Sequence, residues 1–211
     1  MMKFNKGFVV AAVALAVQLA AIGWLVWRYE RIVLNGSEVR IKCQSYDPYD
    51  PLRGRYLSMT VREDCTNILF DASGQSEYER RNDVFVQLGE IPGSNGLYRV
   101  EAVAKEPTDG GLWARPKWVR MEYALGYSDK GKDESYDDFH ARREKSGRKA
   151  VVSFPDQLFV NEKVAPEAEK LLRERTASAV AVYRVLGGEA VLTDIEIDGK
   201  PILSAVTENQ K

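Results

Sequence analysis

The residues best suited to chemistry or binding are concentrated between positions 45 and 59, in the segment SYDPYDPLRGRYLSM. Two Asp-Pro dipeptides come first, and a glycine between two arginines follows them. Each proline fixes its own φ angle and holds the aspartate before it in extended backbone. The pattern predicts a rigid corner, in which the aspartates cap their own backbone and Gly54 supplies an unusual φ angle.

The same rigid corner could also serve as a docking surface, because exposed arginines and tyrosines are typical of interfaces. Glu162 lies between an apolar strand and a helix in the segment LFVNEKV. Its carboxylate could bind Arg53, Arg55 or a ligand, or form an ordinary ion pair. The candidate interaction residues are Asp47, Pro48, Asp50, Pro51, Arg53, Gly54, Arg55, Tyr56 and Glu162.

A catalytic alternative rests on Ser45. The segment Ser-Tyr-Asp-Pro, followed by Gly54-Arg55, is similar to the Ser-Met-x-Pro and Gly-Asp motifs of membrane-anchored signal-peptidase-like enzymes. Those enzymes activate the serine with a desolvated lysine, and the base here would be a residue such as Lys105. Tyrosine in place of methionine and arginine in place of aspartate depart from that pattern, so a hydrolase is the alternative hypothesis.

Composition argues against several other chemistries. With 30 basic and 31 acidic residues, the net charge of -1 lacks the basic surplus of a nucleic-acid-binding protein. The only histidine is His140, which rules out a multi-histidine metal site. The acids Asp133, Glu134, Asp137 and Asp138 lack the Asp-x-Asp-x-Asp-Gly pattern of a calcium loop, so they predict a solvated face. No phosphate-binding loop is present, and we expect no cofactor.

Residues 8–27 form an uncharged stretch whose only strongly polar side chain is Gln18. Twenty helical residues span about 30 Å, the thickness of a hydrocarbon core. Trp24, Trp27 and Tyr29 form an aromatic belt at the second interface. A cleaved signal peptide would have a shorter apolar region and a small-x-small cleavage site. The pattern therefore favours an uncleaved signal anchor that crosses the bilayer.

The orientation of this span is not fixed by its flanking charges. Lys3 and Lys6 favour a cytoplasmic N-terminus, whereas the arginines after the span oppose it. Two cysteines, Cys43 and Cys65, are 22 positions apart and could form a disulfide if the domain lies outside the cytoplasm.

After the span the chain alternates between apolar and polar residues in a way that indicates strands. Residues 30–44 are predicted to be a linker that enters a first strand. Trp113 and Trp118, on either side of Pro116, are predicted to be core or groove residues. One helix is predicted to begin near Pro166. The remaining predicted strands lie in 57–62, 84–91, 97–106, 112–127, 151–164 and 177–202, the last with a Gly-Gly turn and then an Asp-Gly turn at 198–199, and 128–149 is predicted as an exposed loop or short helix.

The segments DPYDPLRGRYLSMTV and QLFVNEKVAPEAEKLL resemble the bacterial GDYXXLXY proteins. Gly54 and Tyr56 agree with the family motif, but Arg55 replaces its aspartate, so no role for that carboxylate carries over. The resemblance implies a single-pass membrane protein with an extracytoplasmic domain, in the company of polytopic membrane proteins.

Together these observations predict an N-terminal transmembrane helix followed by one mainly β (α+β) domain with one or two short helices. The predicted boundaries are a tail at 1–7, the span at 8–27, the domain at 28–207 and a polar tail at 208–211. The expected role is a non-catalytic assembly, docking or sensing module beside a polytopic membrane protein. The expected location is the bacterial inner membrane, with the domain periplasmic or extracellular.

Overall fold

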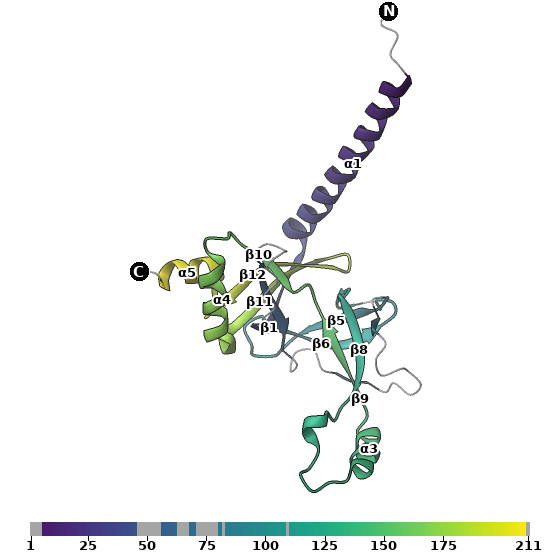
Figure 1. The fold of residues 1–211 in the computed structure, drawn as a ribbon, viewed down its shortest axis with the longest axis vertical. Helices are drawn as coiled ribbons and strands as arrows, with labels where there is room; N and C mark the ends of the chain where they lie inside the picture. The colour runs from purple at the N-terminus through teal and green to yellow at the C-terminus, as the bar shows by residue number, and fades with distance from the viewer. Residues whose placement is uncertain are drawn as a thin grey trace, which may run out of the picture.

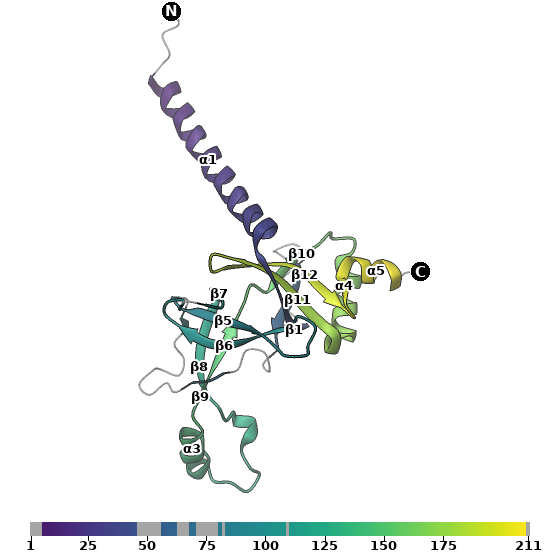
Figure 2. The same ribbon diagram turned by 180° about the vertical axis from the view of Figure 1, so that it is seen from behind.

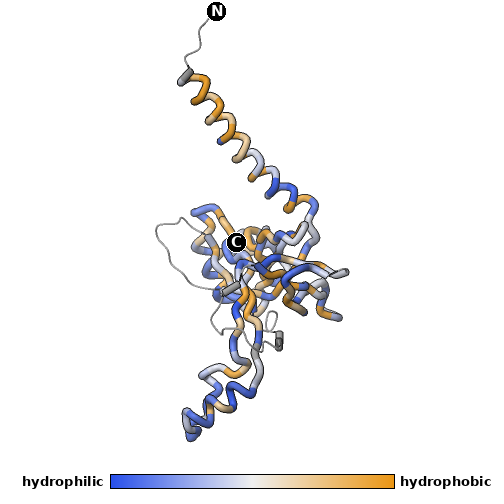
Figure 3. The backbone as a smooth tube through the Cα atoms, turned by 90° about the vertical axis from the view of Figure 1, so that its right-hand side faces the viewer, coloured by the Kyte–Doolittle hydropathy of each residue, from blue (hydrophilic) through white to orange (hydrophobic). Residues whose placement is uncertain are grey.

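The computed structural model describes residues 6–45, 56–62, 68–70, 80–81, 83–108 and 110–209. It confirms the predicted fold class: a long N-terminal helix is followed by a mainly β domain with a few short helices (Figure 1). Helix α1 (Lys6–Asn35) is long and apolar enough to cross a membrane, and no part of its apolar stretch is buried inside the protein. Its outer part is hydrophobic, and it turns hydrophilic where it approaches the domain (Figure 3).

The helix is longer than the predicted span. Residues 30–35, which the sequence suggested as part of a linker, are helical. The reason is tertiary: Ile32 is only 5% exposed, so the last helical turns have their own packing surface on the domain.

The largest sheet has six antiparallel strands in the order β10-β2-β1-β11-β12-β13. The long hairpin of this sheet turns at Gly187-Gly188, where both φ angles are positive, as a two-residue type I′ turn requires. The strands are β1 (Ser37–Ser45), β2 (Tyr56–Val61), β10 (Gln157–Phe159), β11 (Ala179–Leu186), β12 (Glu189–Ile197) and β13 (Lys200–Pro201).

Two smaller antiparallel sheets complete the β structure. One has the order β3-β9-β8-β4 and the other β6-β5-β7. The run predicted at 112–127 is two strands, because Pro116 lacks a backbone N–H and falls between them. The strands are β3 (Ile68–Phe70), β4 (Arg80–Arg81), β5 (Phe85–Glu90), β6 (Tyr98–Ala104), β7 (Leu112–Ala114), β8 (Trp118–Tyr123) and β9 (Arg148–Ser153).

Helices α4 (Ala165–Glu174) and α5 (Ile202–Asn209) pack together beside the six-stranded sheet (Figures 1 and 2). Helix α4 has proline in its first turn, as predicted, and buries Ala168, Leu171 and Leu172. Helix α5 is an addition to the predicted elements. Two 3-10 turns, η1 (Tyr127–Asp129) and η2 (Thr176–Ser178), are also present.

The core is built from the inward-facing residues of the central strands, which alternate along β1. Val39, Ile41 and Cys43 of β1 are all fully buried. Tyr183 of β11 is buried too, and its hydroxyl donates a hydrogen bond to the Pro155 carbonyl over 2.9 Å. This bond ties the link between β9 and β10 to the sheet interior, because an unpaired buried hydroxyl would be costly.

Residues 124–147 form a projection at the end of the β8–β9 hairpin, here called the distal lobe. It contains η1 and helix α3 (Tyr136–Lys145), so the region predicted as a loop or short helix contains a helix. The lobe hangs at the end of the domain that is opposite to α1 (Figure 1).

Candidate membrane-proximal site

The junction between α1 and the domain has no flexible linker. Helix α1 ends at Asn35, and β1 begins two residues later. The Gly36 amide donates to the Ile32 carbonyl over 2.8 Å. A Cβ at Gly36 would lie 2.5 Å from that carbonyl oxygen, so only glycine fits without a shift of the backbone. The helix therefore enters the sheet through a fixed turn.

Charged side chains brace this junction. Arg28 of α1 forms an ion pair with Glu189 at the start of β12. Arg184 of β11 donates to the Gly36 carbonyl over 3.3 Å and to the Glu38 carboxylate over 2.8 Å. Both pairs are partly exposed, so each contributes little free energy of folding. Their effect is to orient the helix that the burial of Ile32 holds in place.

Glu189 also lines a groove of about 460 Å³, here called the membrane-proximal groove because it adjoins the domain end of the apolar helix α1. It lies where the start of β12, the link between β7 and β8, and the link between β9 and β10 come together. Its lining residues are Arg115, Pro116, Lys117, Pro155, Asp156, Gln157, Phe159, Glu189 and Ala190.

The two cations of the β7–β8 link differ in their partners. Lys117 Nζ lies 2.9 Å from both carboxylate oxygens of Asp156, so its charge is neutralised. Arg115 has no carboxylate partner among the described residues. Its backbone N–H donates to the Gly188 carbonyl over 2.6 Å, and its guanidinium carbon lies 4.9 Å from the ring centroid of Phe85. Arg115 is therefore an exposed, positioned and unpaired cation.

The aromatic part of the groove comes from β10, the edge strand. Phe159 is 74% exposed, although it follows two partly buried residues in the same strand. Its ring centroid lies 6.2 Å from that of Tyr56, its register partner on β2. Strand β10 is the edge strand of the sheet that the described residues form, and the Phe159 side chain lies on its exposed face.

Of the residues predicted to form an interaction surface, those from Asp47 to Arg55 lie outside the described residues. Tyr56 lies in β2, half-buried, beside the groove. Glu162 lies just beyond β10 and is exposed. The structure therefore brings Tyr56 to the groove and leaves the role of the corner itself as a prediction.

The hydrolase hypothesis gains no support from the described residues that it names. Ser45 ends β1 opposite Met59. Lys105 is exposed just after β6, whereas a lysine that activates a serine must be desolvated. Within the described ranges, no group of three His, Cys, Asp or Glu side chains could hold a metal ion.

Cys43 is fully buried and forms no disulfide among the described residues, and Cys65 lies outside them. The disulfide between them therefore stays a prediction. Burial raises the pKa of Cys43 from 9.0 to about 12. Because only the thiolate reacts, we expect Cys43 to be alkylated about a thousandfold more slowly in the native protein than after unfolding at pH 8. Timed iodoacetamide labelling with mass spectrometry measures this ratio.

Trp113 is buried in the core, as the core-packing interpretation predicted, and Trp118 is half-buried. The sequence did not single out Arg115, Phe159 or Glu189. The Gly-Gly turn before Glu189 was the one usable signal, because it fixes that residue at the turn end of a hairpin. Arg115 and Phe159 are brought to the groove by pairing between strands that are far apart in the sequence.

A model of the GDYXXLXY protein family matches residues 18–195, which covers most of the apolar helix and nearly all of the β domain. No curated protein and no solved structure matches the chain.

Proposed function

The chain belongs to the GDYXXLXY family, and on this premise we propose that it is a single-pass membrane protein that assembles with a polytopic membrane protein. Its β domain acts as a non-catalytic docking module that is held at a fixed position beside that partner. The observation that carries the proposal is Gln18, a carboxamide at the centre of the apolar helix with no hydrogen-bond partner among the described residues.

Gln18 lies midway along the stretch 8–27, and its side chain is exposed. In a bilayer this carboxamide would be in hydrocarbon, where no water can pair with it. A neighbouring transmembrane helix can supply the missing donor and acceptor, and such bonds contribute about 1–2 kcal/mol in model helices.

The same face of the helix can come close to another helix. Positions spaced alternately by four and three residues share one face of an α-helix. On the face of Gln18 these positions are small as far as residue 21, before Leu25, and small residues allow close backbone approach between membrane helices. They are Gly7, Ala11, Ala14 and Ala21.

The rigid junction supports a role in assembly. Since Gly36 and Ile32 fix α1 on the sheet, the helix and the domain orient as one body. A partner that binds the helix inside the membrane therefore also determines which side of the domain faces it. We place the domain on the outer side of a bacterial inner membrane, with α1 as an uncleaved signal anchor.

The test is crosslinking in intact membranes, followed by mass spectrometry of what co-purifies with the full-length protein. Gln18→Leu removes the carboxamide but keeps the segment apolar, and we expect it to lower the yield of a polytopic partner at least about fivefold. Ala14→Leu, on the same face, should also weaken assembly.

The matched control is Ala16→Leu, which adds the same bulk on the opposite face of the helix. Equal partner yields from wild type, Gln18→Leu and Ala16→Leu would contradict the proposal, and so would the absence of a stoichiometric partner. Ser45→Ala should leave the yield unchanged. An exposed cysteine introduced at Tyr136 reports the orientation, because only an outward domain reacts with an impermeant maleimide in intact cells.

A further inference from the structure

We propose that the membrane-proximal groove lies in the headgroup layer of the bilayer and binds an anionic phospholipid. This inference rests on the insertion of α1 in a membrane, as proposed above, but not on the polytopic partner. Its occupant is a lipid of the surrounding leaflet.

The depth of the groove follows from one ion pair. Arg28 is the first charged residue after the apolar stretch and directly follows Trp27, so its guanidinium belongs at the level of the headgroups. Glu189, which pairs with Arg28, is itself a wall of the groove. The groove is therefore held next to the polar boundary of the membrane.

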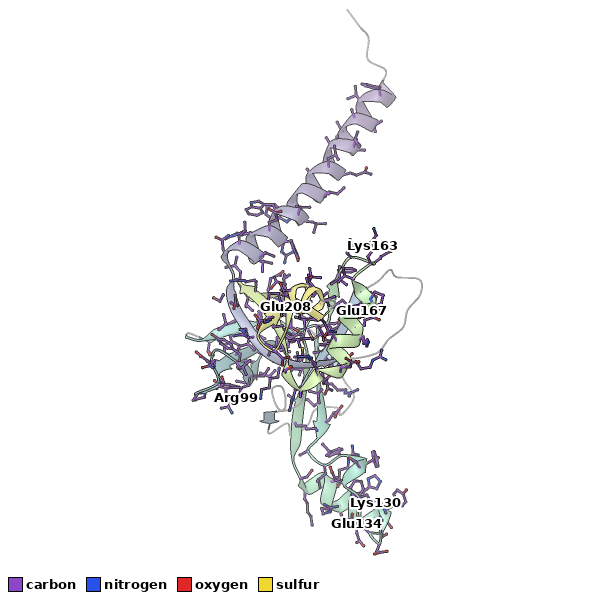
Figure 4. The ribbon with its side chains drawn as sticks, turned by 90° about the vertical axis from the view of Figure 1, so that its left-hand side faces the viewer. Arg99, Lys130, Glu134, Lys163, Glu167 and Glu208 are labelled. Carbon is purple, nitrogen blue, oxygen red and sulfur yellow. The ribbon has the colours of Figure 1, made fainter. Side chains whose placement is uncertain are left out.

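The absence of a flexible linker between α1 and β1 holds the groove close to the end of the membrane-spanning stretch. From Trp27 to Asn35 the helix rises only about 12 Å before the chain enters β1. The helix leaves the domain obliquely in two perpendicular views, so one side of the domain faces the membrane (Figures 1 and 4). Strand β10 lies on that side in Figure 1, and Lys163, just beyond this strand, lies on it in Figure 4.

The charges of the groove select an anion. Arg28 neutralises Glu189, and Lys117 neutralises Asp156, which leaves Arg115 as the charge of the groove without an ion pair to any described residue. Its guanidinium offers several donors in a planar fork that matches a phosphate group. The Phe85 ring and the backbone bond to Gly188 hold it in place, so little entropy is lost on binding.

The apolar rim fits the other half of a phospholipid. Phe159, the most exposed aromatic side chain of the described β domain, lies on the same groove beside Tyr56. Aromatic side chains gather at the boundary between headgroups and acyl chains. An acidic peptide would satisfy Arg115 but would not explain a bare phenylalanine at headgroup depth.

The first test measures depth. The full-length protein with Cys65→Ser is placed in lipid nanodiscs, and a spin label is attached at Phe159→Cys or, as a control, at Tyr136→Cys on the distal lobe. The relative accessibility to oxygen and to a water-soluble nickel complex reports the depth of each label. We expect the label at 159 at the headgroup boundary and the label at 136 in water. Equal exposure of both labels to water would overturn the proposal.

The second test measures lipid selection. Native mass spectrometry compares the phosphatidylglycerol and phosphatidylcholine retained by the protein from mixed nanodiscs. Arg115→Ala should lower the anionic-to-zwitterionic ratio about fivefold, the factor for one basic residue near an anionic surface. Arg99→Ala removes an exposed arginine from another part of the domain and should leave the ratio unchanged (Figure 4). Equal ratios for both variants would overturn the proposal.

The outcomes separate this inference from the proposed function. If carbonate extraction releases the protein from membranes, both fail. If the protein stays inserted and Gln18→Leu has no effect on co-purification, only the assembly role fails. If the label at 159 is buried in native membranes but exposed to water in nanodiscs of the pure protein, a protein partner fills the groove and the lipid proposal is wrong.

Discussion

The membrane-proximal groove and the distal lobe both combine arginines with aromatic rings, but the arginines of the two regions have different partners. In the lobe, Arg142 donates to both carboxylate oxygens of Glu134 over 2.8–2.9 Å. In the groove, the Arg115 guanidinium has only the face of Phe85 as a partner within the described ranges. The first arrangement is closed on itself, whereas the second leaves a cation available to a ligand.

Arg143 is the buried arginine of the lobe, and its guanidinium has several partners there. Its guanidinium carbon lies 4.4 Å from the Tyr123 ring centroid and 4.5 Å from that of Tyr127. Its Nε donates to the Leu125 carbonyl over 3.1 Å. Arg143 is thus a structural residue of the lobe, whereas Asp133, Asp137 and Asp138 are exposed, as the predicted solvated face requires. Function is better sought where good donors lack partners.

The largest effect should come from breaking the lobe. Arg143→Ala removes two cation–π contacts and the donor to Leu125 from a site that is only 9% exposed. We expect a loss of about 2–4 kcal/mol in the local stability of the lobe. Hydrogen exchange should show faster exchange in α3 and unchanged exchange in β11, because the lobe is joined to the domain only through β8 and β9.

The control for this variant is Arg142→Ala, on the solvent side of the same helix, which should have a much smaller effect. Equal protection of α3 in wild type and Arg143→Ala would show that the stacked arginine does not hold the lobe together.

A smaller loss should follow from breaking the junction. Gly36→Ala places a Cβ 2.5 Å from the Ile32 oxygen and 3.0 Å from the Val185 nitrogen. Backbone atoms cannot move aside as a flexible side chain can, so we expect a loss of about 1–3 kcal/mol. Thermal unfolding in detergent measures it. Gly23→Ala, where a Cβ meets nothing within 4 Å, should melt like wild type. An equal decrease in the melting temperature of both variants would show that the effect comes from the substitution of a helix-associated glycine and not from the junction.

Much of the fold was predictable because its strands are amphipathic. Along β2 the buried positions alternate with half-buried ones, and Leu57, Met59 and Val61 all point inward as the sequence pattern indicated. The Gly187-Gly188 turn was equally clear, because a two-residue hairpin requires positive φ angles. The extension of α1 through residues 28–35 was not predictable, since it depends on where Ile32 packs.

The groove was harder to predict for a similar reason. Arg115 and Glu189 are 74 positions apart, and a parallel bridge between Ala114 and Gly188 brings them together. Phe159 belongs to the apolar run LFV, which indicates burial, yet its ring is exposed on the edge strand β10. Local patterns carry no information about which strand ends at an edge or which links share a surface.

The smallest effect we predict is a pH dependence confined to the lobe. The hydrogen bonds from Arg142 and from the Gly131 amide lower the pKa of Glu134 below its ordinary value of 4.5. The unfolded lobe therefore binds this proton more readily than the folded one. The stabilising contribution is complete above about pH 4.5 and is lost as the pH falls through the lowered pKa.

A spin label at Tyr136→Cys should gain mobility in that acidic range, and Glu134→Gln should remove the transition. The label at Phe159→Cys is the comparison, since none of the groove's contacts involves Glu134. A parallel gain of mobility at both labels would mean that acid loosens the whole domain and that the lobe is not an independent unit.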